Sequence, residues 1–285
     1  MWQDLATSPV GCAVAIGLGL LWGSFANVCI YRLPAGQSIV TPGSHCGACK
    51  APVRWYDNVP VLAYFWLRGR CRACGVRFSP RYALVEALTG ALFGVAWWFT
   101  LGTGGLLAGS IELRALHFAI DATFVLVMVV IAFIDIDHKL IFNKVVLPAI
   151  VVFYAVTFAL PERRWWDGLL GIAIGYGVPW LIGEIYFRLR KREGLGLGDA
   201  TLLALVGALL GWRGVVCSLF GGSVVGTVVE ISKLVARGRS NDAGADGEAT
   251  VMTTELPFGP YLAIAAVFYL FAEPYVLLHF RLFGG

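Results

Sequence analysis

Long runs of apolar residues constrain this chain more than any other feature. One run covers 124–134 without a polar side chain and stops at Asp135. Runs that cross a bilayer need about 20 residues and must satisfy their backbone hydrogen bonds internally, as helices or closed barrels do. Barrel strands alternate apolar and polar residues over about 10 positions, and these runs show no such alternation. The sequence therefore predicts an all-α polytopic membrane protein with about eight transmembrane helices.

Composition supports this class, because 58% of the 285 residues are hydrophobic and only 14% are charged. A soluble domain of this length displays more charge. The first run has no Lys or Arg before it, so we expect a retained span rather than a cleaved signal peptide. The predicted spans are 10–31, 82–104, 115–134, 145–160, 168–187, 199–212, 214–234 and 257–279.

Three segments follow from this pattern. The first transmembrane helix occupies 1–31, a polar insert occupies 32–81, and a transmembrane catalytic core occupies 82–285. Within the core, 237–256 is rich in Gly, Ala, Asp and Ser. It cannot bury a core of its own, so we expect a flexible loop.

Basic residues predict the orientation. Most of the 22 Lys and Arg residues lie on one side if the N-terminus is outside, and cytoplasmic loops carry such an excess. The insert and the loop at 237–256 are then cytoplasmic. Arg163 and Arg164, in a short outer loop, are a local exception. The net charge of +4 is explained by this excess of Lys and Arg in the cytoplasmic loops. It requires no nucleic-acid partner, and we expect none.

The insert contains two Cys-x2-Cys pairs, Cys46 with Cys49 and Cys71 with Cys74. Such pairs on tight turns supply four thiolates to one tetrahedral zinc ion. A reducing compartment argues against two disulfides. Four protein ligands leave no open position on the metal, so the zinc would be structural. The alternatives are reduced thiols or a redox pair.

Two aspartates are the candidate catalytic residues. Asp135 ends an inward-running span, and Asp199 follows the glycine-rich segment 194–198 and begins another span. One span leads out and one leads back between them, which places both carboxylates at the same depth. Carboxylates at membrane depth are costly and mark functional sites. A pair that shares a proton can activate water. Gly196 and Gly198 give the backbone freedom beside Asp199 and let a substrate strand approach.

Other interpretations of these residues remain open. The aspartates can be ordinary interfacial carboxylates, or they can bind protons or cations in a coupled transporter. A zinc-organised membrane scaffold without chemistry is a third possibility. Asp137 lies two residues from Asp135, faces elsewhere on a helix and is interpreted as interfacial.

Several motifs, in order along the chain, resemble the bacterial type IV prepilin peptidases, or leader peptidase/N-methyltransferases, which are intramembrane aspartic proteases of the GxGD type. They are GSFANVCIYRLP at 23–34, the two cysteine pairs with DNVP at 57–60 and LRGRC at 67–71 between them, Arg81 to Glu86, Ile134 with Asp135, GLGD at 196–199 and PFGPYL at 257–262.

The resemblance implies an enzyme of the bacterial inner membrane with its active site near the cytoplasmic face. It would remove the basic leader of type IV prepilins or type II secretion pseudopilins, with Asp135 and Asp199 as catalytic residues. It would then methylate the new N-terminus using S-adenosylmethionine, for which no site residue is assigned. The cysteines would bind zinc. The chain departs from the family pattern at Gly47, at Phe142 and at Thr201, where the family commonly has proline, proline and lysine.

Overall fold

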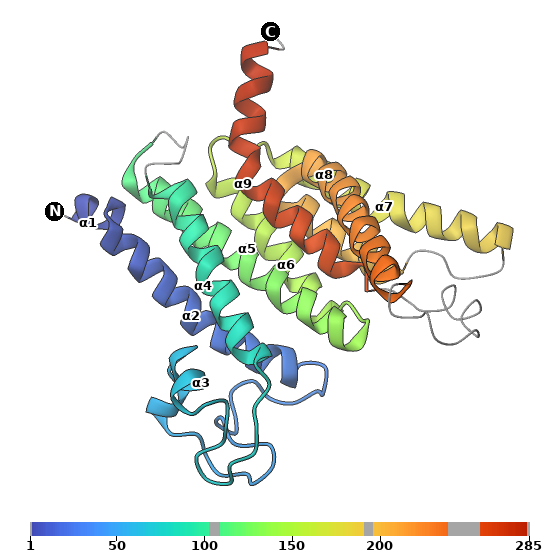
Figure 1. Ribbon diagram of the computed structural model, residues 1–285. Coiled ribbons are helices and arrows are strands. Elements are labelled where there is room, and N and C mark those ends of the chain that lie inside the picture. Colours follow the sequence, from blue (N-terminus) through green and yellow to red (C-terminus); the bar gives the residue numbers. More distant parts are fainter. Residues whose placement is uncertain (1, 103–108, 191–195, 239–256, 284–285) are drawn as a thin grey trace. The chain divides into compact units, whose positions relative to one another are not determined.

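The described part of this chain is built from helices (Figure 1). The computed structural model describes residues 2–102, 109–190, 196–238 and 257–283. Within them no strand forms, apart from two isolated bridges in the insert. The helices are α1 (Trp2–Thr7), α2 (Pro9–Arg32), α3 (Leu62–Trp66), α4 (Arg81–Thr100), α5 (Ile111–His138), α6 (Asn143–Val156), α7 (Trp165–Arg190), α8 (Leu197–Gly238) and α9 (Gly259–Phe283), with 3-10 turns η1 (Trp55–Asn58) and η2 (Thr157–Ala159).

Among the described residues, six helices are long and apolar enough to cross a membrane, namely α2, α4, α5, α7, α8 and α9. The predicted class, an all-α polytopic membrane protein, is confirmed. The predicted count of eight is not. The predicted span 145–160 falls in a shorter apolar helix, Asn143–Ala159, and the predicted spans 199–212 and 214–234 both fall in α8.

A sharp bend in α8 explains why the sequence suggested two spans there. Gly211 has φ 66° and ψ −173°, a conformation that interrupts the helix and that residues with a Cβ rarely adopt. Near this bend, Arg163 Nη1 donates a hydrogen bond to the carbonyl oxygen of Leu209 at 2.6 Å. Arg163 was an exception to the expected charge distribution, and this contact gives it a structural role at the bend.

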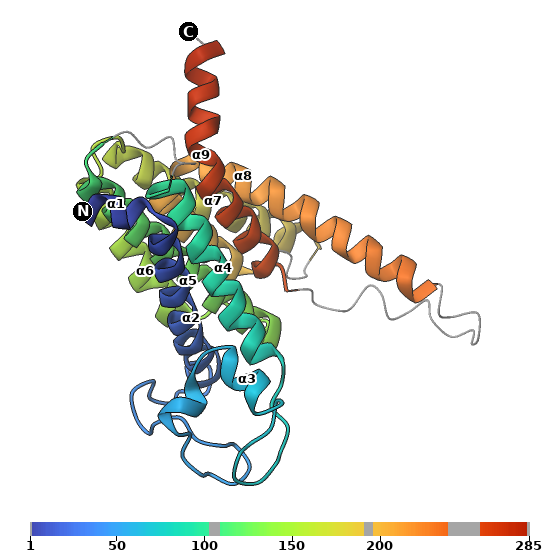
Figure 2. The ribbon, with the colours of Figure 1, turned by 60° about the vertical axis from the view of Figure 1, so that its left-hand side comes forward.

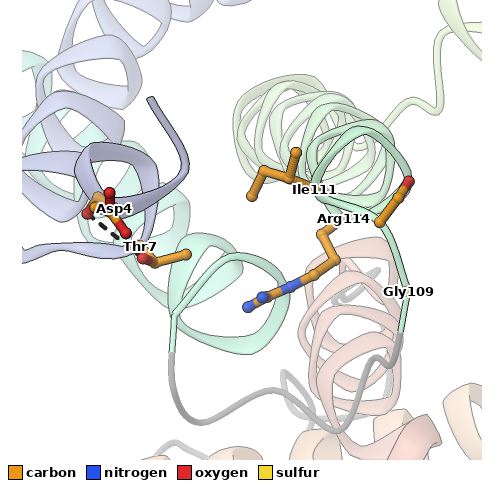
Figure 3. A pocket seen from close by; sticks show the side chains of 6 residues that line it. Asp4, Thr7, Gly109, Ile111 and Arg114 are labelled. Atoms are coloured by element: carbon orange, nitrogen blue, oxygen red, sulfur yellow. Dashed lines mark hydrogen bonds between the residues drawn. The ribbon is translucent and has the colours of Figure 1, made fainter. Parts of the chain in front are cut away.

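A second arginine on the predicted outer side also binds a helix end. Arg114 Nε donates to the carbonyl of Thr100 at 2.8 Å, and its Nη2 donates to those of Leu101 and Gly102 at 2.6 and 3.0 Å. These carbonyl groups lie at the C-terminal end of α4, where they have no hydrogen-bond partner within the helix. Arg114 also lines a small open pocket (Figure 3), together with Asp4, Thr7, Gly109, Ser110 and Ile111.

The chain divides into two compact units, 1–130 with 271–285 and 131–270. In the first unit α2 and α4 lie side by side in both views (Figures 1 and 2). Glycines permit the close approach, since a Cβ on Gly23 would lie 2.7 Å from the Cα atom of Glu86. The predicted segments 1–31, 32–81 and 82–285 stay a prediction. Of the predicted flexible loop, 239–256 lie outside the described residues.

In the second unit α7 packs directly on the first half of α8. A Cβ on Gly171 would lie 2.3 Å from the carbonyl oxygen of Gly207, so the two backbones are in contact. Small residues allow such van der Waals packing between membrane helices. Residues 200–211 of α8 are all buried. The helix that begins beside Asp199 is therefore held firmly in the core of this unit.

Candidate active site and metal centre

Asp135 lies in the last turn of α5 and is only 5% exposed. The helix ends just beyond it, because Lys139 adopts a left-handed conformation with φ 52° and donates its N–H to the Asp135 carbonyl at 2.8 Å. This is a common way to end a helix. Asp137 is exposed, as expected for a residue on another face.

The carboxylate of Asp135 accepts a hydrogen bond from the start of another helix. The N–H of Gly259 donates to Asp135 Oδ2 at 3.0 Å. Gly259 is the first residue of α9, where backbone N–H groups lack partners within the helix. A Cβ on Gly259 would lie 2.7 Å from Oδ2, so a side chain at this position would displace the Asp135 carboxylate. Reasoning from the residues alone missed this partner. The one feature of the sequence that pointed to this partner was Gly259 itself, a glycine before Pro260 near the start of a predicted span.

Asp199 lies in the first turn of α8 and is half-buried. Its N–H donates to the carbonyl of Gly196 at 3.1 Å. A Cβ on Gly196 would lie 3.6 Å from Asp199 Oδ2, and one on Gly198 would lie 3.0 Å from the Cβ of Ile141. The two predicted glycines thus form a close turn around Asp199. Gly194, in the same run, lies outside the described residues.

The structure places the two candidate aspartates in the same region of the second unit. A Cβ on Gly198, next to Asp199, would lie 3.0 Å from the Cβ of Ile141, which is six residues after Asp135. One lies at the C-terminal end of α5 and the other at the N-terminal end of α8, with α6 and α7 between them in the chain. The positive end of the α8 dipole favours a negative charge at Asp199. This arrangement gives two neighbouring carboxyl groups at helix ends, with one further helix N-terminus beside them.

Phe142 and Thr201, where the chain departs from the family pattern near the two aspartates, lie close to each other. Thr201 is buried, and its hydroxyl donates to the carbonyl of Gly198 at 2.7 Å. The same hydroxyl oxygen lies 3.3 Å from Oδ1 of Asn143, which follows Phe142. Thr201 therefore fixes the turn at Gly198 and links it to the start of α6.

The four predicted cysteines form one cluster in the insert. Their sulfur atoms all lie within 4.8 Å of one another, with 3.8 Å between Cys46 and Cys74 and 4.0 Å between Cys49 and Cys71. Tetrahedral zinc with Zn–S bonds of about 2.3 Å separates its ligand sulfurs by about 3.8 Å. The cluster can therefore hold a metal ion of this kind, and the four side chains fit zinc.

The two cysteine pairs have the same backbone geometry. Cys46 and Cys71 donate their N–H groups to residues five further on, Ala51 at 2.9 Å and Val76 at 2.8 Å. Each carbonyl accepts from the residue four further on, which is left-handed in both turns: Lys50 has φ 57° and Gly75 has φ 72°. The insert thus presents two equivalent turns to one centre.

The thiols of this cluster are not equivalent in acidity. Backbone N–H groups of Cys49 and Ala48 donate to the sulfur of Cys46 and lower its pKa to about 6. The Val76 N–H lowers the pKa of Cys74, but loss of water and the neighbouring cysteines outweigh it and raise that pKa to about 11. Metal binding requires thiolates, so the first turn favours the metal-binding form.

Fold and site together define a polytopic membrane protein with paired carboxylates at helix ends and a four-cysteine centre. Residues 18–100 match the family model described as the bacterial peptidase A24 N-terminal domain, and residues 122–231 match that of the type IV leader peptidase family. The chain belongs to the type IV leader peptidase family, which confirms the resemblance seen in its motifs.

Curated relatives extend this match over most of the chain. The prepilin leader peptidase/N-methyltransferase of Myxococcus xanthus is 37% identical over 251 residues, covering 88% of this chain and 70% of the relative. The Pseudomonas putida protein of that name is 34% identical over 294 residues, covering 93% and 92%. The one from Neisseria gonorrhoeae is 33% identical over 269 residues, covering 83% and 87%. No solved structure matches the chain.

Proposed function

We propose that this protein is an intramembrane aspartic endopeptidase that removes the basic leader of type IV prepilins or type II secretion pseudopilins. The observation that carries the proposal is the placement of Asp135 and Asp199 at two helix ends of one unit, with Gly198, next to Asp199, packed against Ile141, six residues after Asp135. The names of the relatives, prepilin leader peptidase/N-methyltransferase, support this activity and give no support to the transporter alternative.

The chemistry needs one ionised and one protonated carboxyl group. The ionised member takes a proton from water, and the water oxygen attacks the scissile carbonyl carbon. The protonated member donates its proton to the carbonyl oxygen. When the tetrahedral intermediate collapses, the C–N bond breaks, the amine takes a proton from the pair, and one hydroxyl of the intermediate returns a proton to the pair as the carbonyl re-forms. We treat the pair as one acid–base unit. The Gly259 amide holds Asp135 Oδ2 in place during this exchange.

The site is proposed to lie near the cytoplasmic face of a bacterial inner membrane. The support is the excess of Lys and Arg in the segments that flank both aspartates. A prepilin has a basic leader in the cytoplasm and an apolar segment in the membrane. Its cleavage site therefore lies at the depth proposed for the two carboxylates.

The cysteine cluster is proposed to hold zinc, which would fix the two turns of the insert to each other. Four sulfurs would occupy every position of a tetrahedral ion and leave none for a substrate, so the zinc would have a structural role. The relatives' names, which include N-methyltransferase, also support a second activity, the transfer of a methyl group. We propose S-adenosylmethionine as the donor and the new N-terminal amine as the acceptor. We assign no residue to that step.

The test incubates purified protein with a prepilin and S-adenosylmethionine and weighs the products by mass spectrometry. The wild-type protein should remove the leader and add one methyl group. Asp135→Asn and Asp199→Asn should each reduce cleavage by about 10²- to 10⁴-fold, because each removes one partner of the acid–base pair. Asp137→Asn, an exposed neighbour on the same helix, is the matched control and should cleave normally. Undiminished cleavage by both site variants would rule out the mechanism.

A further inference from the structure

The short helix α3 exposes an unusual amount of apolar surface. Leu62 is 63% exposed, Phe65 is 70% exposed and Trp66 is 67% exposed. Three large apolar side chains within one five-residue helix form a patch of the kind that marks a protein or membrane contact. We call these three residues the α3 patch.

The fold places the α3 patch beside a membrane-spanning helix. The N–H of Val61, just before α3, donates to Glu86 Oε2 at 2.7 Å. Glu86 lies five residues after the start of α4, which is about 7.5 Å along the helix axis. Val61 itself has φ 60° and ψ −52°, a strained conformation for a β-branched residue. Such strain persists where the surroundings fix the backbone, so this attachment is a built feature of the unit.

The surface of α4 at this level is also apolar and exposed. Tyr82 is 45% exposed, Leu84 is 59% exposed and Leu88 is 38% exposed. Because α4 is long and apolar enough to cross a membrane, exposed apolar side chains on it suit contact with lipid. Figure 2 shows α3 next to the beginning of α4. The α3 patch therefore lies next to the exposed apolar side chains at the beginning of α4, the end of that helix that joins the insert.

Positive charge follows the α3 patch directly. Arg68 and Arg70 have exposed side chains, and both come within four residues of Trp66. Aromatic residues combined with arginines are typical of segments that lie in the plane of a membrane surface. The ends of the insert are attached to α2 and α4, both candidate membrane spans, and the hydrogen bond from Val61 to Glu86 keeps α3 close to the beginning of α4.

We propose that α3 is an interfacial anchor of the cysteine-containing insert, with the α3 patch inserted at the boundary of headgroups and acyl chains. Arg68 and Arg70 bind anionic headgroups beside it. The anchor holds the insert at a fixed height on the bilayer. A basic substrate leader would be repelled by the same arginines, which is why we assign this surface to lipid rather than to the prepilin.

The test uses the full chain in lipid nanodiscs, with the photoreactive amino acid benzoylphenylalanine placed either at Phe65 or at Val76. Val76 is the matched control, because it is an exposed apolar residue on the second cysteine turn. Illumination should attach lipid at position 65 and leave position 76 at background. Mass spectrometry reports the adducts, and an unchanged melting temperature shows that each variant is folded.

Charge supplies the second arm of this experiment. In discs containing phosphatidylglycerol, Arg68→Gln and Arg70→Gln should each lower the ratio of lipid-linked to free protein at position 65 by about fivefold. In discs of phosphatidylcholine alone the same changes should have no effect. Equal adducts at positions 65 and 76 would overturn the proposal. So would preferential cross-linking of position 65 to an added prepilin, which would mark the patch as a substrate surface.

Discussion

One backbone amide sets the position of a candidate catalytic side chain. Asp135 ends α5, and the N–H of Gly259 holds its Oδ2 from the first residue of α9. The absence of a side chain at Gly259 is what allows the approach, since a Cβ there would lie 2.7 Å from Oδ2. At the scale of residues, the site therefore depends on a glycine as much as on the two aspartates.

Gly259→Ala should weaken catalysis more than folding. The added methyl group pushes the Asp135 carboxylate out of position, and a displacement of about 1 Å can cost about 10²-fold in rate. Gly17→Ala is the control, because nothing lies within 4 Å of a Cβ at that position in α2. Prepilin cleavage rates and thermal melting of both variants provide the measurement. Full activity of Gly259→Ala would show that the contact does not position Asp135.

At the scale of elements, the contact between α7 and α8 supports the site. Gly171 and Gly207 touch through their backbones, and a Cβ on Gly175 would lie 2.4 Å from the carbonyl oxygen of Leu203. This packing holds the first half of α8 in the core and so fixes the helix end that carries Asp199. Arg163 supports the same half-helix from the other end, at the bend near Gly211.

Gly171→Ala should separate α7 from α8. Its methyl group would lie 2.3 Å from a backbone oxygen that cannot rotate away, and overpacking of this kind costs about 1–3 kcal/mol. Gly177→Ala, in the same helix, meets nothing within 4 Å and gains up to about 1 kcal/mol of helix propensity. Melting temperatures in detergent should therefore move in opposite directions. A stable Gly171→Ala protein would contradict the close contact.

At the scale of the whole molecule, one unit carries the cysteine centre and the other carries the carboxylate pair. The insert buries little, since most of its side chains are exposed. A small segment with little core needs a cross-link to stay ordered, and a metal ion supplies one. The expected consequence is that the metal stabilises the insert without being needed for the membrane helices to form.

Cys46→Ser should abolish zinc binding and expose the insert to protease, because it removes one of four ligands. Cys217→Ser, which changes an exposed cysteine of α8, should retain the metal. Metal analysis of the purified proteins and limited proteolysis are the measurements, and circular dichroism should show the helices intact in both. If Cys46→Ser keeps its full zinc content, the four-cysteine site is wrong.

The sequence by itself determined the membrane class, the cysteine pairs and the two candidate aspartates. Each of these is a local property: a run of apolar residues sets a helix, and a spacing of two residues sets a thiolate pair. The resemblance to prepilin peptidases rested on the same local motifs. The count of eight spans is not confirmed, because the residues predicted as two spans form the two parts of α8 on either side of the bend at Gly211, and α6 is shorter than a full span.

The tertiary structure alone decided which residues meet. The contact of Gly198, beside Asp199, with Ile141, the hydrogen bond from Gly259 to Asp135 and the contact of Gly171 with Gly207 join segments that are far apart in the chain. No periodicity or spacing encodes such pairs, because they arise from the combined packing of several helices. The sequence supplies the reactive groups, and only the packing of helix ends and glycines brings them into one site.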